Sequence, residues 1–185
     1  MKNVPNKIQS VILVLMMCLV SNISNAATKE EIDARVQEAL KNFQTQTSAG
    51  YELSKKAAGV LVFPQVIKAG MGVGGEYGEG ALMIDGKTTS YYNIASASIG
   101  FQLGVQERSQ IILFMTDEVL EEFRNSEGWK AGVNGSVALA NLGAGDEIDT
   151  ETATKPIIGF IFSNKGLMYN LTFEGSKITE IKDKN

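Results

Sequence analysis

The most informative segment of the chain is Gly59–Gly80, which reads GVLVFPQVIKAGMGVGGEYGEG. Its first part, Val60–Phe63, is an apolar run that stops at Pro64, and this pattern is typical of a short buried strand. Glycine inside a strand most often marks a bend or a close approach of two backbones. The segment therefore predicts a strongly curved sheet. Its second part holds six glycines within eleven residues, at Gly70, Gly72, Gly74, Gly75, Gly78 and Gly80.

Two hypotheses for these glycines remain open. They either permit close packing where the sheet bends, or they line a groove in which backbone amides face a phosphate or carboxylate. A dinucleotide site is disfavoured, although Gly70–Gly75 has the spacing G-x-G-x-x-G. The residues that follow are broken by glycine instead of starting a helix, and the position about 20 residues further on carries no acid.

The sequence around this segment predicts further strands. Asp85-Gly86 tolerates the positive φ angles of a tight hairpin turn and separates two predicted strands, 81–84 and 88–93. Residues 111–115 form another apolar strand. Between them, apolar residues alternate with glycine, serine and glutamine, so that one side of a strand is apolar. The residues on that apolar side are Ile99, Phe101, Leu103 and Val105.

Helical patterns lie before and between these strands. Thr28 and Glu31 have the spacing of a capping box, and apolar residues then recur at helical intervals, which predicts a helix over 29–44. A second short helix is predicted to carry Tyr51, Leu53 and Ala57 and to end at Gly59. A third helix is expected at about 117–126, with Gly128 suited to its C-terminal end.

The last third of the chain repeats the strand pattern. A strand is predicted over 131–139, with Val133 and Val137 on one face, and a polar loop over 143–155. Strands at 157–162 and 167–173 flank Asn164-Lys165-Gly166, and a last strand over 178–181 closes the sheet. The predicted class is α+β, with a mostly antiparallel, strongly curved or barrel-like sheet, two N-terminal helices and one inserted helix.

The N-terminal 26 residues have the three parts of a secretory signal peptide. Lys2 and Lys7 form a basic region, Val11–Val20 is an apolar run, and cleavage is expected after Ala26. The apolar run is shorter than the roughly 20 residues that cross a bilayer. Lipid attachment at Cys18 is disfavoured because bulky Met17 precedes it. We therefore expect an exported, periplasmic protein with a single domain over 27–185.

Composition excludes several kinds of chemistry. The chain has no histidine, so it can form neither a Ser-His-Asp triad nor an imidazole metal site. Removing the leader with Lys2 and Lys7 leaves 15 basic residues against 21 acidic ones, a net charge of −6, and this argues against nucleic acid as a partner. The acidic stretch Asp146–Glu151 lacks the spacing of a calcium loop and is interpreted as a solvated loop. No cofactor and no metal are expected.

Several ordered motifs resemble the SYLF domain family. Residues 58–70 read AGVLVFPQVIKAG and run into the glycine-rich segment, and 97–104 read ASIGFQLG. Further matches are ILFMT at 112–116, Lys165-Gly166-Leu167 and Glu174-Gly175-Ser176. The resemblance covers roughly 29–181. It implies a lipid-binding module, because eukaryotic relatives bind phosphoinositide membranes, yeast relatives also bind actin, and bacterial relatives are typically exported single-domain proteins.

The first hypothesis for function is therefore a non-enzymatic, periplasmic protein of the cell envelope that binds anionic head groups or acyl chains. A basic side chain near an acidic lipid surface favours attachment. The alternative is a structural or protein-interaction module of the envelope whose partner is another polypeptide. A third hypothesis is acid–base catalysis by Glu76 or Glu79. The candidate lipid-binding residues are Lys55, Lys56, Lys68, Gly70, Gly72, Gly74, Gly75, Arg108 and Lys130.

Overall fold

The computed structural model describes residues 27–140, 148–163, 166–168 and 171–182 of the chain. The predicted signal peptide, residues 1–26, lies outside these ranges. No helix in the described ranges is long and apolar enough to cross a membrane. The described elements are α2 (Lys29–Gln46), α3 (Ser48–Ser54), β1 (Gly59–Ile84), β2 (Lys87–Phe114), α4 (Asp117–Arg124), β3 (Trp129–Lys130), β4 (Ala138–Leu139), α5 (Thr150–Ala153), β5 (Ile157–Ser163), β6 (Gly166–Leu167) and β7 (Lys177–Glu180).

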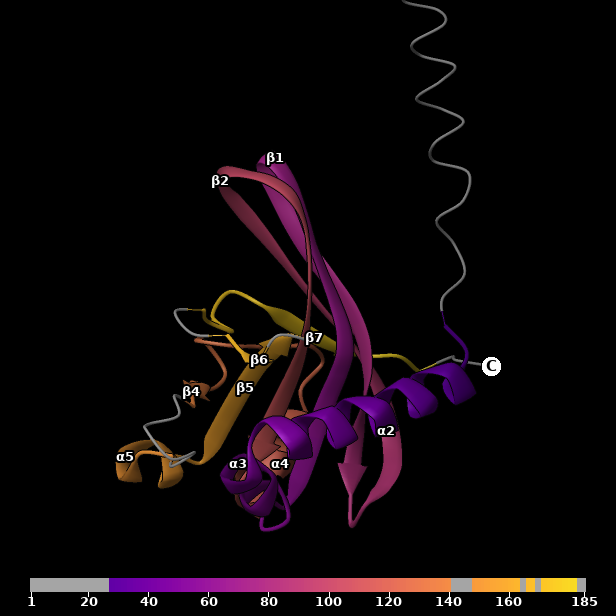
Figure 1. Ribbon diagram of the computed structural model, residues 1–185. Helices are drawn as coiled ribbons and strands as arrows, with labels where there is room; N and C mark the ends of the chain where they lie inside the picture. The colour runs from indigo at the N-terminus through magenta and orange to yellow at the C-terminus, as the bar shows by residue number, and fades with distance from the viewer. Residues whose placement is uncertain (1–26, 141–147, 164–165, 169–170, 183–185) are drawn as a thin grey trace, which may run out of the picture.

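A long antiparallel hairpin of β1 and β2 dominates the fold. It is paired from Ile84 and Lys87 at the turn to Gly59 and Phe114 at its open end. The turn is the predicted one, and Asp85 and Gly86 take φ angles of 51° and 72°. The two-stranded ribbon folds back on itself, and its bent end projects away from the helices (Figure 1). The predicted strand curvature is thus confirmed.

Pro64 does not end the first strand, contrary to the prediction. The pairing of β1 with β2 shifts register between Phe63 and Val66, so the two intervening residues form a bulge. A bulge needs no ladder hydrogen bond from the proline nitrogen, and the strand can therefore continue. The bulge also changes which residues face which side, since Leu61, Phe63 and Val66 all belong to one core.

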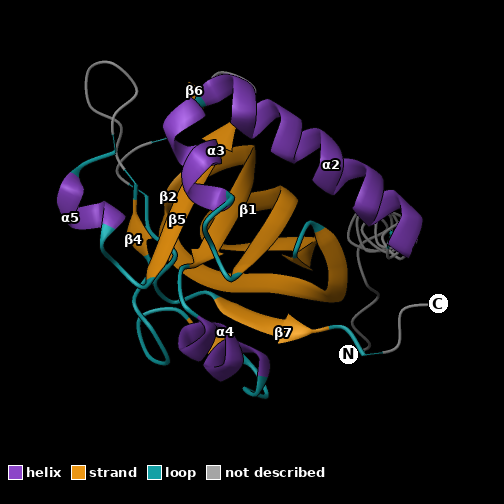
Figure 2. Cartoon of the chain, turned by 90° about the horizontal axis from the view of Figure 1, so that it is seen from below, coloured by secondary structure: helices purple, strands orange, loops and turns teal. Residues whose placement is uncertain are grey.

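The sheet is mostly antiparallel, as predicted. Its order is β3-β7-β2-β5-β4, with β1 paired to β2 and β6 paired to β5. Strand β2 is long enough to pair with β7 near residues 92–95 and with β5 near residues 109–114. Among the described strands only β4 and β5 pair in parallel. The class is therefore α+β, with one curled sheet (Figure 2).

Two apolar cores lie on the two sides of this sheet. Figure 2 shows α2 and α3 on one side of the sheet and α4 on the other. On the first side, Val36 and Phe43 of α2 pack with Ala81 and Ile111. On the second side, the buried residues include Leu120, Phe123, Trp129, Ile94 and Phe114. Trp129 is 2% exposed, so it is a core residue.

The helices follow the predicted pattern with one exception. Helix α2 begins at the predicted capping box, in which the Thr28 hydroxyl accepts from Glu31 N and the Glu31 carboxylate accepts from Thr28 N. Helix α4 starts at Asp117, as expected. Helix α3 ends at Ser54, earlier than the predicted end at Gly59. Residues 55–58 instead form a turn that leads directly into β1.

The predicted strand over 131–139 is wrong. Asn134 Oδ1 accepts from Lys130 N, and the backbone N–H of Asn134 donates to Lys130 O. This compact turn leaves Val133 78% exposed. Only the two residues of β4 pair with β5. Local hydrogen bonds from asparagine can compete with a strand ladder, and this competition explains the difference.

The remaining C-terminal predictions are met in part. Strands β5 and β7 lie where they were expected. The predicted 143–155 loop contains α5, and the Asp149 carboxylate caps this helix by accepting from Thr152 N. Of the predicted strand over 167–173, only Leu167 belongs to a strand, β6, and residues 171–173 are irregular. Residues 141–147, 164–165 and 169–170 lie outside the described part of the chain.

Candidate functional site

The glycines of β1 that can be assessed serve close packing. A Cβ added at Gly80 would lie 2.0 Å from the Val62 carbonyl oxygen, and one at Gly78 would lie 2.6 Å from the Gln65 carbonyl oxygen. The second half of β1 thus crosses directly against the first half of the same strand. At these two positions the space is filled by the protein's own backbone, so the packing hypothesis holds there and the groove hypothesis does not.

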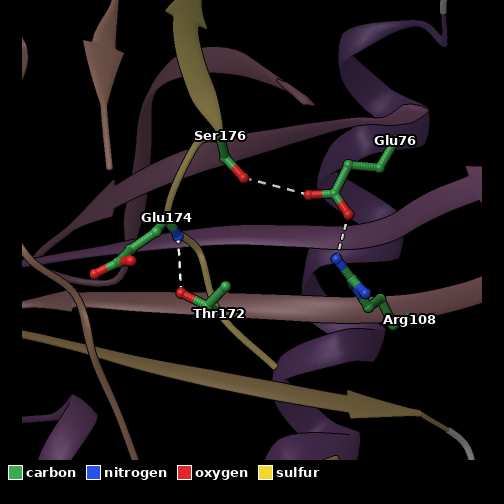
Figure 3. A network of polar contacts seen from close by, with 5 residues as sticks. All are labelled: Glu76, Arg108, Thr172, Glu174 and Ser176. Atoms are coloured by element: carbon green, nitrogen blue, oxygen red, sulfur yellow. Dashed lines mark hydrogen bonds and ion pairs between the residues drawn. The ribbon is translucent and has the colours of Figure 1, made fainter. Parts of the chain in front are cut away.

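A buried ion pair lies where the halves of the ribbon approach one another. The Arg108 guanidinium of β2 donates through Nη2 to Glu76 Oε2 of β1, and the two side chains are 4% and 5% exposed. Ser176 Oγ, just before β7, donates to Glu76 Oε1 at 3.3 Å (Figure 3). The network joins three parts of the chain that are distant in sequence. Glu76 is therefore held in a structural contact, and Arg108 is buried and not available at the surface.

A polar cleft of about 850 Å³ lies between α2 and the bulged part of the ribbon. Arg35 of α2 crosses it and donates to Gln65 Oε1 at 3.2 Å. Gln46 Nε2, at the end of the same helix, donates to Ser163 O at 2.9 Å. Glu38 and Glu107 also line the cleft, so acidic groups balance its basic ones. This charge balance does not favour an anionic head group.

An exposed apolar face lies on the outer part of the ribbon. We name residues 67–77 of β1 and their partners 95–107 of β2 the distal ribbon. Ile67 is 44% exposed, Tyr77 52% and Val105 73%, although each is a large hydrophobic residue. Because side chains alternate along a strand, odd-numbered residues share the face on which Ala81 and Ile111 meet α2. Helix α2 therefore covers this face near the turn, at Ala81, and near the open end, at Ile111, and leaves it open on the distal ribbon.

Tyr77 is half-exposed and makes a hydrogen bond to Glu79. Burial raises the pKa of the Tyr77 phenol to about 12, and the Glu79 carboxylate contributes to the shift. Tyr77 donates to Glu79 Oε1 at 3.1 Å, and Glu79 Oε2 accepts from Ala27 N at 3.2 Å. Glu79 therefore contacts both its own strand and the residue that precedes the capping box of α2.

The structure does not bring the candidate lysines together with Arg108. Lys55 pairs with Glu52 at 2.6 Å and lies over the Tyr51 ring, and Lys56 follows it in the exposed turn after α3. Lys68 lies in β1 opposite Gln106, and Lys130 lies in β3 opposite Lys177. The candidate glycines at 70, 72, 74 and 75 all lie in the distal ribbon, where the hairpin folds back.

Sequence reasoning missed two features of this site. It did not pair Glu76 with Arg108, because 32 residues separate them and no local pattern joins them. The alternation at Ile99–Val105 predicts an apolar strand face, but the prediction did not include Ile67 and Tyr77 on the same face. The available signal was that the apolar residues of both strands occupy odd-numbered positions. Within the part of the chain that is described, no cluster of three acidic or cysteine residues could hold a metal ion.

These observations define a class: a small α+β protein with a folded β-ribbon, a polar cleft beside its first helix and an open apolar sheet face. Comparison with known proteins then identifies the family. A profile of the Ysc84 family, described as "Las17-binding protein actin regulator", matches residues 95–185. The chain belongs to this family, which is also called the SYLF domain family. The resemblance seen in the motifs is thus confirmed.

Vertebrate relatives are similar over most of the chain. The SH3 domain-containing YSC84-like protein 1 of Rattus norvegicus and that of Homo sapiens are each 30% identical over 135 residues, and the Xenopus laevis protein is 27% identical. The match covers 70% of this chain. It covers only 39% of the rat and human proteins and 40% of the frog protein, so the chain corresponds to well under half of these relatives.

Proposed function

We propose that the protein is a non-enzymatic module of the bacterial cell envelope that attaches to lipid membranes. The observation that carries this proposal is the exposure of Ile67, Tyr77 and Val105 on one face of the distal ribbon. Exposed apolar patches of this kind mark sites that meet a membrane or a partner. The periplasmic location rests on the signal-peptide pattern of residues 1–26.

The lysines play a secondary part in this proposal. Lys55, Lys56 and Lys130 are exposed and Lys68 is half-buried, so each can meet an anionic head group as a separate contact. They lie in three separate places, the turn after α3, β1 and β3, and Arg108 is held by Glu76. Apolar contact therefore provides most of the membrane affinity, and the lysines change that affinity to a smaller extent. If binding required anionic lipid, the lysines would be the main contributors and the apolar contacts the minor ones.

Flotation of the folded protein with vesicles tests the proposal. Neutral phosphatidylcholine vesicles and vesicles that also contain phosphatidylglycerol are used in parallel, and circular dichroism verifies that the protein is folded. We expect the protein to float with both kinds of vesicle. A folded protein that stays at the bottom of the gradient with both kinds would reject membrane attachment.

The comparisons favour a second candidate, a protein-interaction module. The family description names a Las17-binding actin regulator, and the relatives are named as SH3 domain-containing proteins. The same open face or the cleft beside α2 could then receive a polypeptide. Crosslinking in the native envelope distinguishes the two functions. A stoichiometric polypeptide partner, captured by protein that does not float with vesicles, would establish the second.

A further inference from the structure

The distal ribbon has a sharp boundary between charged and uncharged sequence. On β1 the residues between Lys68 and Glu76 carry no charged side chain, and on β2 the same holds from Thr88 to Gln106. On leaving this end, Lys68 and Glu107 are met within one residue of being register partners, and Glu76 is met four residues past the bend at Gly72. The returning arm of β2 stays uncharged as far as Lys87, beside the hairpin turn. The folded end is therefore uncharged on both strands.

The two faces of this uncharged end differ. Ala69 and Val105 are register partners on the odd-numbered face and both are exposed, as are Ala95 and Ala97 on the other half of the ribbon. Such a surface suits an apolar phase on one side and head groups on the other.

From these observations we propose that the uncharged end of the distal ribbon inserts into one leaflet of the bilayer and stops at the level of Lys68, Glu76 and Glu107. This inference rests on the proposed membrane attachment and names the element that enters the lipid. A lipid phase fits because the exposed residues of this end, Ala69, Ala95, Ala97 and Val105, include no charged side chain, and because charges resume at about one level on three of its four strand arms. Tyr77 lies close to that level, where the amphipathic tyrosine ring is favoured at a membrane interface.

The length of the uncharged end sets the depth of insertion. The strand segment from Lys68 to the bend at Gly72 is about four residues long, which corresponds to about 13 Å of extended strand at about 3.3 Å per residue. This is well short of a hydrocarbon core of about 30 Å. An oblique ribbon of this length reaches the depth of about 5 to 10 Å that is typical of interfacial elements. The end therefore enters a single leaflet and does not span the membrane.

Single-cysteine labelling tests this inference directly. The one cysteine, Cys18, lies in the predicted leader, so the expected mature chain, residues 27–185, can carry one new cysteine at a chosen position. We would place a polarity-sensitive fluorophore at Val105→Cys in the uncharged end. The matched control is Val133→Cys, because Val133 is just as exposed, at 78%, but lies in the turn between β3 and β4. Phosphatidylcholine vesicles with quenchers at shallow and deep chain positions report the depth.

The expected result is a blue shift and shallow-quencher contact at Val105→Cys, with no change at Val133→Cys. A Val105→Asp variant should weaken partition about tenfold, since a carboxylate is disfavoured in the lipid, whereas Val133→Asp should not. If the protein floats but the probe at 105 stays in water, or if both probes respond alike, leaflet insertion is overturned while membrane attachment stands. If the protein does not float, the proposed function itself fails.

Discussion

Glu76 and Arg108 form an ion pair that is almost fully buried, and it joins the two strands of a ribbon that folds back on itself. Arg108 is paired in register with Val66, while Glu76 is paired with Ser96, so the ion pair is not a contact between ladder neighbours. It connects the two halves of the folded ribbon across the bend. Ser176 adds a third segment to the same carboxylate.

Removing one member of this pair should destabilise the protein strongly. Glu76→Gln leaves the Arg108 charge buried without its counter-ion, and loss of one partner in such a pair costs about 3 to 5 kcal/mol. The double variant Glu76→Leu with Arg108→Met should cost clearly less, because no charge is then buried. Urea unfolding measures both. Glu52→Gln, which breaks the exposed pair with Lys55, is the control and should change stability little. A double variant less stable than Glu76→Gln would contradict the argument.

Gly80→Ala should prevent the two halves of β1 from crossing at their present distance. The added Cβ would meet the backbone of Val62, which cannot move aside as a flexible side chain can. We expect a loss of about 3 kcal/mol, at the upper end for overpacking. Thermal unfolding measures it. Gly75→Ala is the matched control, since its Cβ would lie 3.2 Å from Ser96 O, and it should cost much less. Equal losses would show that β-strand propensity, and not the crossing, explains the effect.

Thr28→Ala should weaken the start of α2. The variant loses the hydroxyl that accepts from Glu31 N, and loss of such a cap costs about 1 kcal/mol. Because α2 covers one core of the sheet, the loss should appear in global unfolding by urea. Thr45→Ala is the control, since its hydroxyl only donates to a carbonyl of its own helix, at Asn42. A Thr45→Ala variant that lost as much stability would refute the role of the cap.

Alkaline pH should destabilise the fold through Tyr92. Burial, and to a lesser extent the charge of Glu180, raises the pKa of Tyr92 to about 12 in the folded protein. The unfolded phenol has a pKa of about 10, so between these values the folded state holds the proton more tightly. Stability therefore falls as pH rises from about 10 to about 12. Chemical unfolding at several pH values measures the slope.

Tyr92→Phe isolates this contribution. The variant should show a shallower loss of stability over the same pH range, because phenylalanine has no proton to release. Burial also raises the pKa of Tyr77 and Tyr91 to about 12, so part of the slope should remain. A slope identical to that of the wild type would mean that Tyr92 does not contribute.

Local features of the chain were predictable. The Thr28 and Glu31 pair defined the start of α2, and Asp85-Gly86 defined the hairpin turn, since each acts through hydrogen bonds or φ angles within a few residues. Two predictions made from local patterns failed. The pattern at Pro64 predicts a strand end because a bulge depends on the partner strand, which is distant in sequence. At Val133, the turn around Asn134 takes the place of the predicted strand.

The candidate site was predictable only in outline. Alternation showed that one side of the strand near Val105 is apolar, but it could not show whether a helix covers that side. Sequence left the glycines of β1 compatible with a groove or with close packing, and the structure decides for packing at Gly78 and Gly80. Arg108 was assigned to a basic surface because sequence does not reveal burial.

Sequence alone determined the element types, the hairpin, the antiparallel character of the sheet and the family, because these depend on spacing and on residues that are close along the chain. The tertiary structure decided where the ribbon folds back, which charge meets Glu76 and which apolar face remains open. These depend on contacts between residues far apart in sequence, and such contacts are selected by packing in three dimensions.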